Sequence, residues 1–154
     1  MTATIRRARA GDADALTRLM HASSAYAGRY GAILDGYAVT PGQIAHDLLF
    51  VAESNGRVEG FYSLALGDEP ELDLMFVADR TQGSGLGRAL FDHMAATAAS
   101  QGVAAVKIIS HPPSVGFYER MGARIVGRLP PSARVAWERP IPSLHIEATD
   151  SEGF

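Results

Sequence analysis

The sequence predicts one α/β domain in which helices flank a mixed sheet. Three local patterns carry this prediction: the Asn55-Gly56 pair between two strand-like runs, the glycine-rich turn at Gly83–Gly87, and the nearly continuous apolar run from Val103 to Ser110. Asn-Gly favours a tight β-hairpin, whereas an apolar run of this length is typical of a buried central strand. Hairpins combined with crossover helices indicate a mixed sheet.

The first third of the chain is expected to form a short strand followed by helices. We predict a strand at Thr4–Arg9 and a helix that ends near Ala22, because apolar residues recur there at helical spacing. A second helix within Ser23–Val39 is weakened by three glycines. Thr40-Pro41 supplies a cap followed by proline, so a short helix should begin there and end near Leu49.

The middle of the chain is expected to form three consecutive strands. Phe50–Glu53 and Arg57–Leu66 should make the hairpin, and Glu71–Val77 should follow after a polar loop. The alternation in this last strand predicts that Leu72, Leu74 and Phe76 share one face.

The remaining elements alternate helices and strands. In order we expect a helix at Leu86–Ser100, a strand at Val103–Ser110, a helix at Ser114–Met121 and strands at Arg124–Leu129 and Val135–Trp137, with Leu144–Ile146 as a further candidate. No linker or repeat interrupts the pattern, so residues 1–148 are predicted to be one domain and residues 149–154 a flexible tail.

Composition narrows the possible chemistry. The chain has 154 residues, a net charge of −3 and no cysteine, which excludes disulfides, thiolate metal sites and a cysteine nucleophile. The negative net charge argues against a protein dedicated to binding nucleic acid. The polar N-terminus and the lack of a long apolar run predict a cytoplasmic protein without membrane segments, and we expect no metal.

The turn from Gln82 to Arg88 has the features of a phosphate site. Its glycines allow close backbone approach, and the helix that follows presents unpaired N–H groups with a partial positive charge. The lysine of a Walker A loop is missing, and Arg88 stands where a dinucleotide fingerprint needs its third glycine.

Gln82-x-x-Gly85-x-Gly87 between a strand and a helix resembles the acyl-CoA motif of the GNAT superfamily of N-acyltransferases. A second segment, Pro113–Ala123, carries Phe117-Tyr118 on a helix that ends at glycine and resembles the second cofactor motif of this family. The resemblance covers Ile5 to Ala136. It implies a GNAT-like, mostly antiparallel sheet that splays apart at the cofactor site, with acetyl-CoA as the acyl donor.

The resemblance also assigns candidate roles to residues on both sides of the splayed strands. The cofactor-binding candidates are Phe76, Val77, Gln82, Gly83, Ser84, Gly85, Leu86, Gly87, Arg88, Ser114 and Phe117. Two positions depart from the family pattern: His111 stands where asparagine is common, and Asp79 where proline is common.

Acyl transfer to an amine needs a base for the ammonium and an acid for the leaving thiolate. Tyr118 is the candidate acid, since its phenol has an ordinary pKa of about 10 and its position matches the tyrosine of the family. Glu71 is the candidate base, directly or through water, and Asp73 on the same strand face is the alternative. Without cysteine, direct attack by the amine is the simplest route.

The acceptor is expected to be a primary amine of a small molecule or a peptide. Tyr26, Tyr30 and Trp137 lie in regions that the family uses to line the acceptor pocket, so they are candidate substrate-binding residues. A homodimer is a candidate assembly. Two alternatives stay open: a non-catalytic acyl-CoA-binding or regulatory module, and a transferase that uses another donor such as aminoacyl-tRNA.

Overall fold

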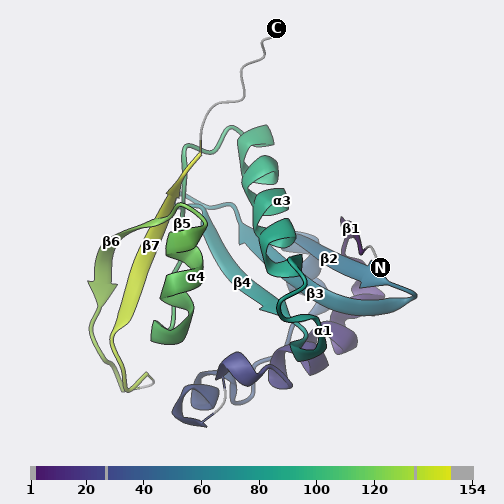
Figure 1. Cartoon of the computed structure of the whole chain (residues 1–154), viewed down its shortest axis with the longest axis horizontal. Coiled ribbons are helices and arrows are strands. Elements are labelled where there is room, and N and C mark those ends of the chain that lie inside the picture. The colour runs from purple at the N-terminus through teal and green to yellow at the C-terminus, as the bar shows by residue number, and fades with distance from the viewer. Residues whose placement is uncertain (1–2, 27, 134, 147–154) are drawn as a thin grey trace, which may run out of the picture.

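A seven-stranded sheet runs through the molecule in the order β1-β2-β3-β4-β5-β7-β6 (Figure 1). The computed structural model describes residues 3–26, 28–133 and 135–146. The strands are β1 (Thr4–Arg7), β2 (Leu48–Ser54), β3 (Arg57–Ala65), β4 (Glu71–Val77), β5 (Ala105–Lys107), β6 (Arg124–Leu129) and β7 (Arg139–His145). Among the strand pairs of the described residues, only β4–β5 is parallel, so the predicted mixed, mostly antiparallel sheet is confirmed. The predicted tail at 149–154 lies outside the described residues.

Helices cover both faces of this sheet (Figure 1). The α-helices are α1 (Ala13–His21), α2 (Pro41–His46), α3 (Leu86–Ser100) and α4 (Val115–Arg120). α3 and α4 pack on one face in a core that includes Leu90, Met94 and Tyr118. α1 packs on the other face in a second core that includes Leu16 and Met20. Among the described residues, no helix is long and apolar enough to cross a membrane.

The region after α1 differs from the prediction. In place of a second α-helix it forms two 3-10 helices, η2 (Ser24–Tyr26) and η3 (Gly28–Leu34). Glycine is a poor α-helix former, and Gly28, the first residue of η3, has a positive φ of 68°. The next helix begins as predicted, with the Thr40 hydroxyl accepting from the Gln43 N–H, but it ends at His46 because Asp47 is already extended.

The hairpin turn forms where it was predicted, with φ of 54° at Asn55 and 74° at Gly56. The face assignment in β4 was wrong. Leu72 packs toward α3, whereas Leu74 and Phe76 pack toward α1. A register shift explains the difference: Leu64 pairs with Leu72 and Ser63 with Leu74, so Asp73 is the extra residue of a β-bulge.

The predicted strand at Val135–Trp137 is absent, and the closing strand is β7 instead. β7 lies between β5 and β6 although it contains Pro140 and Pro142. Their carbonyls accept from the N–H groups of Ser110 and Ile108, but proline has no N–H to donate back. This one-sided ladder explains why β5 ends at Lys107 rather than at Ser110.

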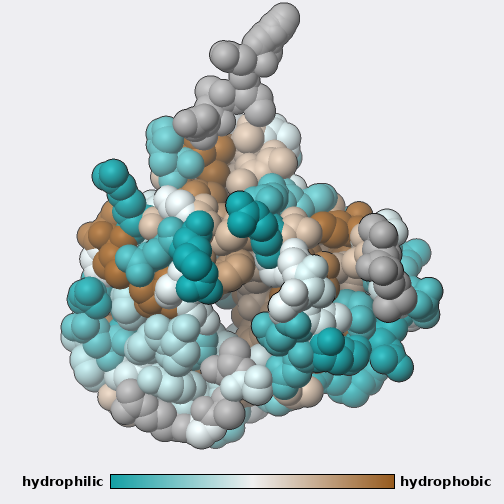
Figure 2. Space-filling model, viewed as in Figure 1, coloured by the Kyte–Doolittle hydropathy of each residue, from teal (hydrophilic) through white to brown (hydrophobic). Residues whose placement is uncertain are grey.

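β4 and β5 pair only at Glu71 and Lys107 and separate beyond that point. The sheet therefore opens at the carboxyl end of β4, just before the glycine turn. The space-filling view shows a hollow in the middle of this face, with apolar atoms at its bottom (Figure 2). The splay expected from the resemblance is present.

Candidate active site between the splayed strands

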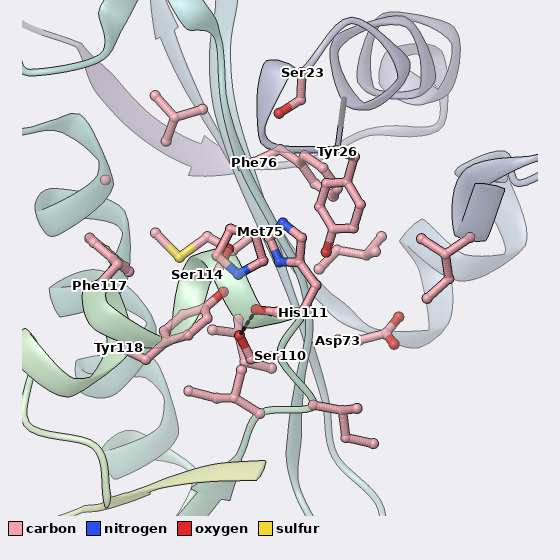
Figure 3. Close-up of a pocket in the computed structure, with 18 of the residues that line it drawn as sticks. Ser23, Tyr26, Asp73, Met75, Phe76, Ser110, His111, Ser114, Phe117 and Tyr118 are labelled. Carbon is pink, nitrogen blue, oxygen red and sulfur yellow. Dashed lines mark hydrogen bonds between the residues drawn. The ribbon is translucent and has the colours of Figure 1, made fainter. Parts of the chain in front are cut away.

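The gap between β4 and the chain that follows β5 is a cavity of about 470 Å³ (Figure 3). One wall is β4 from Glu71 to Val77, and the opposite wall is the segment from Ile108 to Ser114. α4 and the end of the glycine turn close one side, and η2 and η3 close the other. Elements from most of the chain therefore meet at one cavity.

The glycine turn presents its backbone to solvent at one end of this cavity. Gly83 and Gly85 have φ of 80° and 88°, which L-residues adopt only with strain, and Gly85 precedes the first residue of α3. The N–H groups of Gln82 and Ser84 donate within the turn to the carbonyls of Asp79 and Thr81. The N–H groups of Gly85, Gly87 and Arg88 donate to no atom of the described residues, as expected for the start of a helix.

The second motif packs directly against the turn. Gly87 faces the Phe117 ring closely enough that a Cβ built on it would be in van der Waals contact, at 3.5 Å. Phe117 and Ser114 both line the cavity. The Phe117 ring contacts Phe91 of α3 edge-on, with ring centroids 6.0 Å apart.

The backbone of β4 contributes polar groups to the gap. Ala78 donates its N–H to the Glu59 carbonyl of β3, and Phe76 pairs with Phe61 of the same strand. Because polar groups alternate sides along a strand, Met75 and Val77 direct their N–H and C=O groups into the gap. Phe76 instead offers the cavity only its side chain. The sequence analysis did not identify Met75 as a site residue. Which backbone groups of β4 face the gap depends on its pairing with β3, including the bulge two residues earlier.

Tyr118 points from α4 into the cavity and is 9% exposed (Figure 3). Burial, and secondarily the nearby phenol of Tyr26, raise the pKa of Tyr118. The phenol is therefore protonated throughout the neutral pH range. Its hydroxyl makes no hydrogen bond with the described residues.

The two candidate bases lie together on the β4 wall. Burial and the neighbouring charge of Asp73 raise the pKa of Glu71. Burial and the charge of Asp47 raise the pKa of Asp73, which accepts from the Gln43 side-chain amide at 3.2 Å and keeps contact with solvent. Both carboxyl groups thus have pKa values shifted toward neutrality, as suits a general base.

Aromatic rings form the acceptor-side wall. The Tyr26 ring stacks on His111 with centroids 4.1 Å apart and planes 3° from parallel (Figure 3). Tyr30 meets His111 edge-on, and Trp137 meets Tyr30 edge-on at 4.8 Å. Tyr26 lines the cavity, whereas Tyr30 and Trp137 form a layer behind it.

The structure gathers most of the sequence-predicted site residues around one cavity. Those that line it are Glu71, Asp73, Phe76, Val77, Gln82, Gly87, Ser114, Phe117, Tyr118 and Tyr26. Gly83, Ser84, Gly85 and Arg88 lie on the exposed turn beside it, and Leu86 is a core residue rather than a cavity residue. His111, Ser110 and Tyr37 also line the cavity, and no local pattern marked the last two. Among the described residues, no group of three or more His, Asp or Glu side chains is placed to hold a metal ion.

The comparison with known families matches residues 38–128 to the acetyltransferase (GNAT) domain. No curated protein sequence matches the chain. Among solved structures, PaiA N-acetyltransferase from Thermoplasma acidophilum in complex with coenzyme A is 19% identical, with a TM-score of 0.77 and coverage of 94% of this chain and 99% of that one.

Two further structures match over nearly their whole lengths. The ribosomal-protein-S18-alanine N-acetyltransferase from Escherichia coli is 21% identical, with a TM-score of 0.72 and 99% coverage of each chain. YncA from Salmonella typhimurium, solved with its cofactor acetyl-CoA, is 21% identical, with a TM-score of 0.74 and coverage of 96% of this chain and 95% of that one. Identities this low speak for the fold alone, but the domain match spans more than half of the chain. The chain therefore belongs to the GNAT acetyltransferase family, which implies an acyltransferase.

Proposed function

We propose that the protein transfers the acetyl group of acetyl-CoA directly onto a primary amine of a small molecule or peptide. The observation that carries the proposal is the arrangement along one cavity: the open N–H groups of the glycine turn, the buried Tyr118 phenol, and the Glu71 and Asp73 carboxyl groups. The groups proposed for donor binding, acid and base would then all line or border the same cavity. The solved relatives that carry coenzyme A or acetyl-CoA support the choice of donor.

In this proposal the chain binds the donor mainly through backbone groups. The N–H groups of Gly85, Gly87 and Arg88 would bind the pyrophosphate, as helix N-termini commonly do. Met75 and Val77 would pair with the amides of the pantetheine arm, and the Met75 or Val77 N–H would polarise the thioester carbonyl. Acetyl-CoA supplies the acetyl group as a thioester, so no acyl-enzyme is needed.

Two side-chain groups would handle the protons. Glu71 or Asp73 takes a proton from the ammonium, directly or through water, which frees the nitrogen lone pair for attack. Tyr118 donates its phenolic proton to the sulfur as the carbon–sulfur bond breaks, and the second proton that the nitrogen loses on becoming an amide restores the phenol. The raised pKa values of the carboxyl groups favour proton uptake, and the raised pKa of Tyr118 keeps its proton in place until the thiolate forms.

The acceptor would be cationic before it loses its proton. Glu71, Asp73 and the buried Asp47 place three carboxyl groups near the acceptor side. Burial, together with the charges of Asp73 and Asp47, raises the pKa of the Tyr37 phenol beside them. Apolar Ile33 and Leu34 complete this side of the cavity. An amine with an apolar body fits this mixture better than an anionic acceptor does.

The test is to incubate the protein with acetyl-CoA and a panel of amines and to follow free thiol. Because the chain has no cysteine, a thiol reagent detects released coenzyme A without background from the protein. We expect turnover with at least one cationic amine and a rise in Tm with coenzyme A. Thermal stabilisation without turnover over a broad panel would favour a binding or regulatory module. No stabilisation by coenzyme A would refute the donor assignment.

A further inference from the structure

Asp79 ties the glycine turn to the acceptor-side wall. Its carboxylate accepts from the Ser24 N–H at 3.2 Å and 3.3 Å and from the Ser24 hydroxyl at 3.0 Å. Ser24 is the first residue of η2, and Asp79 is the first residue of the 3-10 helix η4 (Asp79–Thr81) that leads into the turn. The link joins segments 55 residues apart in sequence.

Both ends of this link lead to cavity residues within a few positions. Tyr26 ends η2, stacks on His111 and packs against Phe76 with ring centroids 5.4 Å apart. On the other side, the Asp79 carbonyl accepts from the N–H of Gln82, which lines the cavity. The carboxylate of Asp79 therefore connects the part of the site proposed for the donor with the ring proposed for the acceptor.

The turn does not need the Asp79 carboxylate for its own anchoring. Arg80 holds η4 to β3, because its guanidinium pairs with the buried Glu59 and donates to the Val58 carbonyl at 3.1 Å. Thr81 donates its hydroxyl back to Ala78. Removing the Asp79 side chain should consequently release η2 and leave the turn in place.

We propose that Asp79 is a positioning residue that couples donor binding to acceptor binding by holding η2, and with it Tyr26, to the phosphate turn. The inference rests on the proposed function and adds a residue to it. A donor that restricts the turn would restrict η2 through Asp79, so the acceptor would then bind a wall that is already ordered. Coupling of this kind is reciprocal, so the acceptor would strengthen donor binding by the same factor.

Asp79→Pro separates this link from the shape of the turn. Proline is tolerated at the first position of a helix, and the Asp79 N–H donates to no described residue. Ala78 already has φ of −58° and ψ of 139°, the conformation that a following proline favours. The variant thus keeps the backbone of η4 and deletes the three hydrogen bonds. Ser24→Ala is the matched change on the other side, since it removes only the hydroxyl bond.

The first measurement is hydrogen exchange with and without coenzyme A, which needs no amine. In the wild type, coenzyme A should protect both the Gln82–Arg88 turn and the peptide that contains Ser24 and Tyr26. In Asp79→Pro it should protect the turn alone. Protection of the turn without protection of η2 in the wild type would overturn the inference, and so would equal protection of η2 in the variant. No protection of the turn in the wild type would refute the donor assignment and the coupling together.

The second measurement separates the KM values of the two substrates. Loss of hydrogen bonds to a charged group should raise the KM of the amine about tenfold in Asp79→Pro. The Kd of coenzyme A alone should stay within about twofold, and Ser24→Ala should show a smaller effect in the same direction. An unchanged amine KM, or an equal loss of coenzyme A affinity, would overturn the inference. If the wild type binds coenzyme A but turns over no amine, the transferase proposal fails, while the exchange result still decides the link.

Discussion

Replacing Tyr118 by phenylalanine removes one oxygen from the candidate acid and keeps its ring. That ring packs against Phe117 and Phe91, with centroids 5.4 Å and 6.1 Å away. The hydroxyl makes no hydrogen bond with the described residues, so its loss leaves no partner unsatisfied. We therefore expect the free energy of unfolding of Tyr118→Phe to stay within about 1 kcal/mol of the wild type.

The expected loss of activity follows from the role of a general acid. Proton transfer by a positioned side chain contributes about 10²–10⁴-fold to the rate. Burial raises the pKa of Tyr118, which keeps the proton available but makes the phenolate costly. The acid therefore works with little driving force, and we place the loss of kcat near the lower end, about 100-fold, or about 2.7 kcal/mol.

The assay is the release of free thiol from acetyl-CoA at saturating amine, with Tm measured on the same samples. Tyr26→Phe is the matched control, since burial raises the pKa of Tyr26 to about 12 in the same cavity and its ring keeps the stack on His111. The control should alter the KM of the amine more than kcat. A kcat of Tyr118→Phe within about threefold of the wild type, at unchanged Tm, would refute the acid assignment.

The remaining predictions concern titrating groups and the turn. The kcat/KM of the wild type should fall as pH drops through the raised pKa of the base. Of the variants Glu71→Gln and Asp73→Asn, the one that loses both activity and this acidic limb of the pH profile identifies the base. Unchanged profiles in both variants would exclude both residues. Because the fold raises the pKa of Asp73, the stability contributed by its protonated form is present at low pH and is lost as pH rises through the folded pKa. Asp73→Asn should therefore raise Tm at pH 7, and a lowered Tm would contradict this. Burial lowers the pKa of His93, whose ring forms a hydrogen bond with the Tyr62 hydroxyl at 2.8 Å. The stability from the neutral ring is present above about pH 6.5 and is lost as pH falls through the folded pKa, so Tm should fall more steeply with acid in the wild type than in His93→Gln. Parallel plots of Tm against pH for the two proteins would refute this contribution of His93. Gly85→Ala forces an L-residue to φ of 88°, which should cost about 1–2 kcal/mol of stability and weaken coenzyme A binding in calorimetry, and unchanged stability and affinity would exclude strain at this position.

Local chemistry made part of the fold predictable. Asn55-Gly56 adopts positive φ at both residues, Thr40 caps the helix that it precedes, and α3 has the bounds expected from its apolar spacing. Each signal acts within a few residues, so its outcome hardly depends on the rest of the chain. The structure of the segment from Ser23 to Leu34 was harder to predict, because its glycines disfavour an α-helix but do not specify the 3-10 helices that form instead.

The prediction of strand details was wrong where the neighbouring strand of the sheet determines them. The bulge at Asp73 depends on the pairing of β4 with β3, and it reverses the face of Leu72. β7 tolerates Pro140 and Pro142 because their carbonyls still accept hydrogen bonds from the segment that follows β5, which does not require a proline N–H. Neither effect can be read from the alternation of one strand, since both arise from hydrogen bonds between strands.

The family resemblance, the glycine turn and the choice of Tyr118, Glu71 and Asp73 as candidates could all be inferred from the sequence alone. These depend on residue types at fixed spacing, which survive in one dimension. The stacking of Tyr26 on His111 and the hydrogen bonds between Asp79 and Ser24 became visible only in the folded molecule. Such contacts join residues far apart in the chain, and they form only once the sheet and its helices bring the segments together.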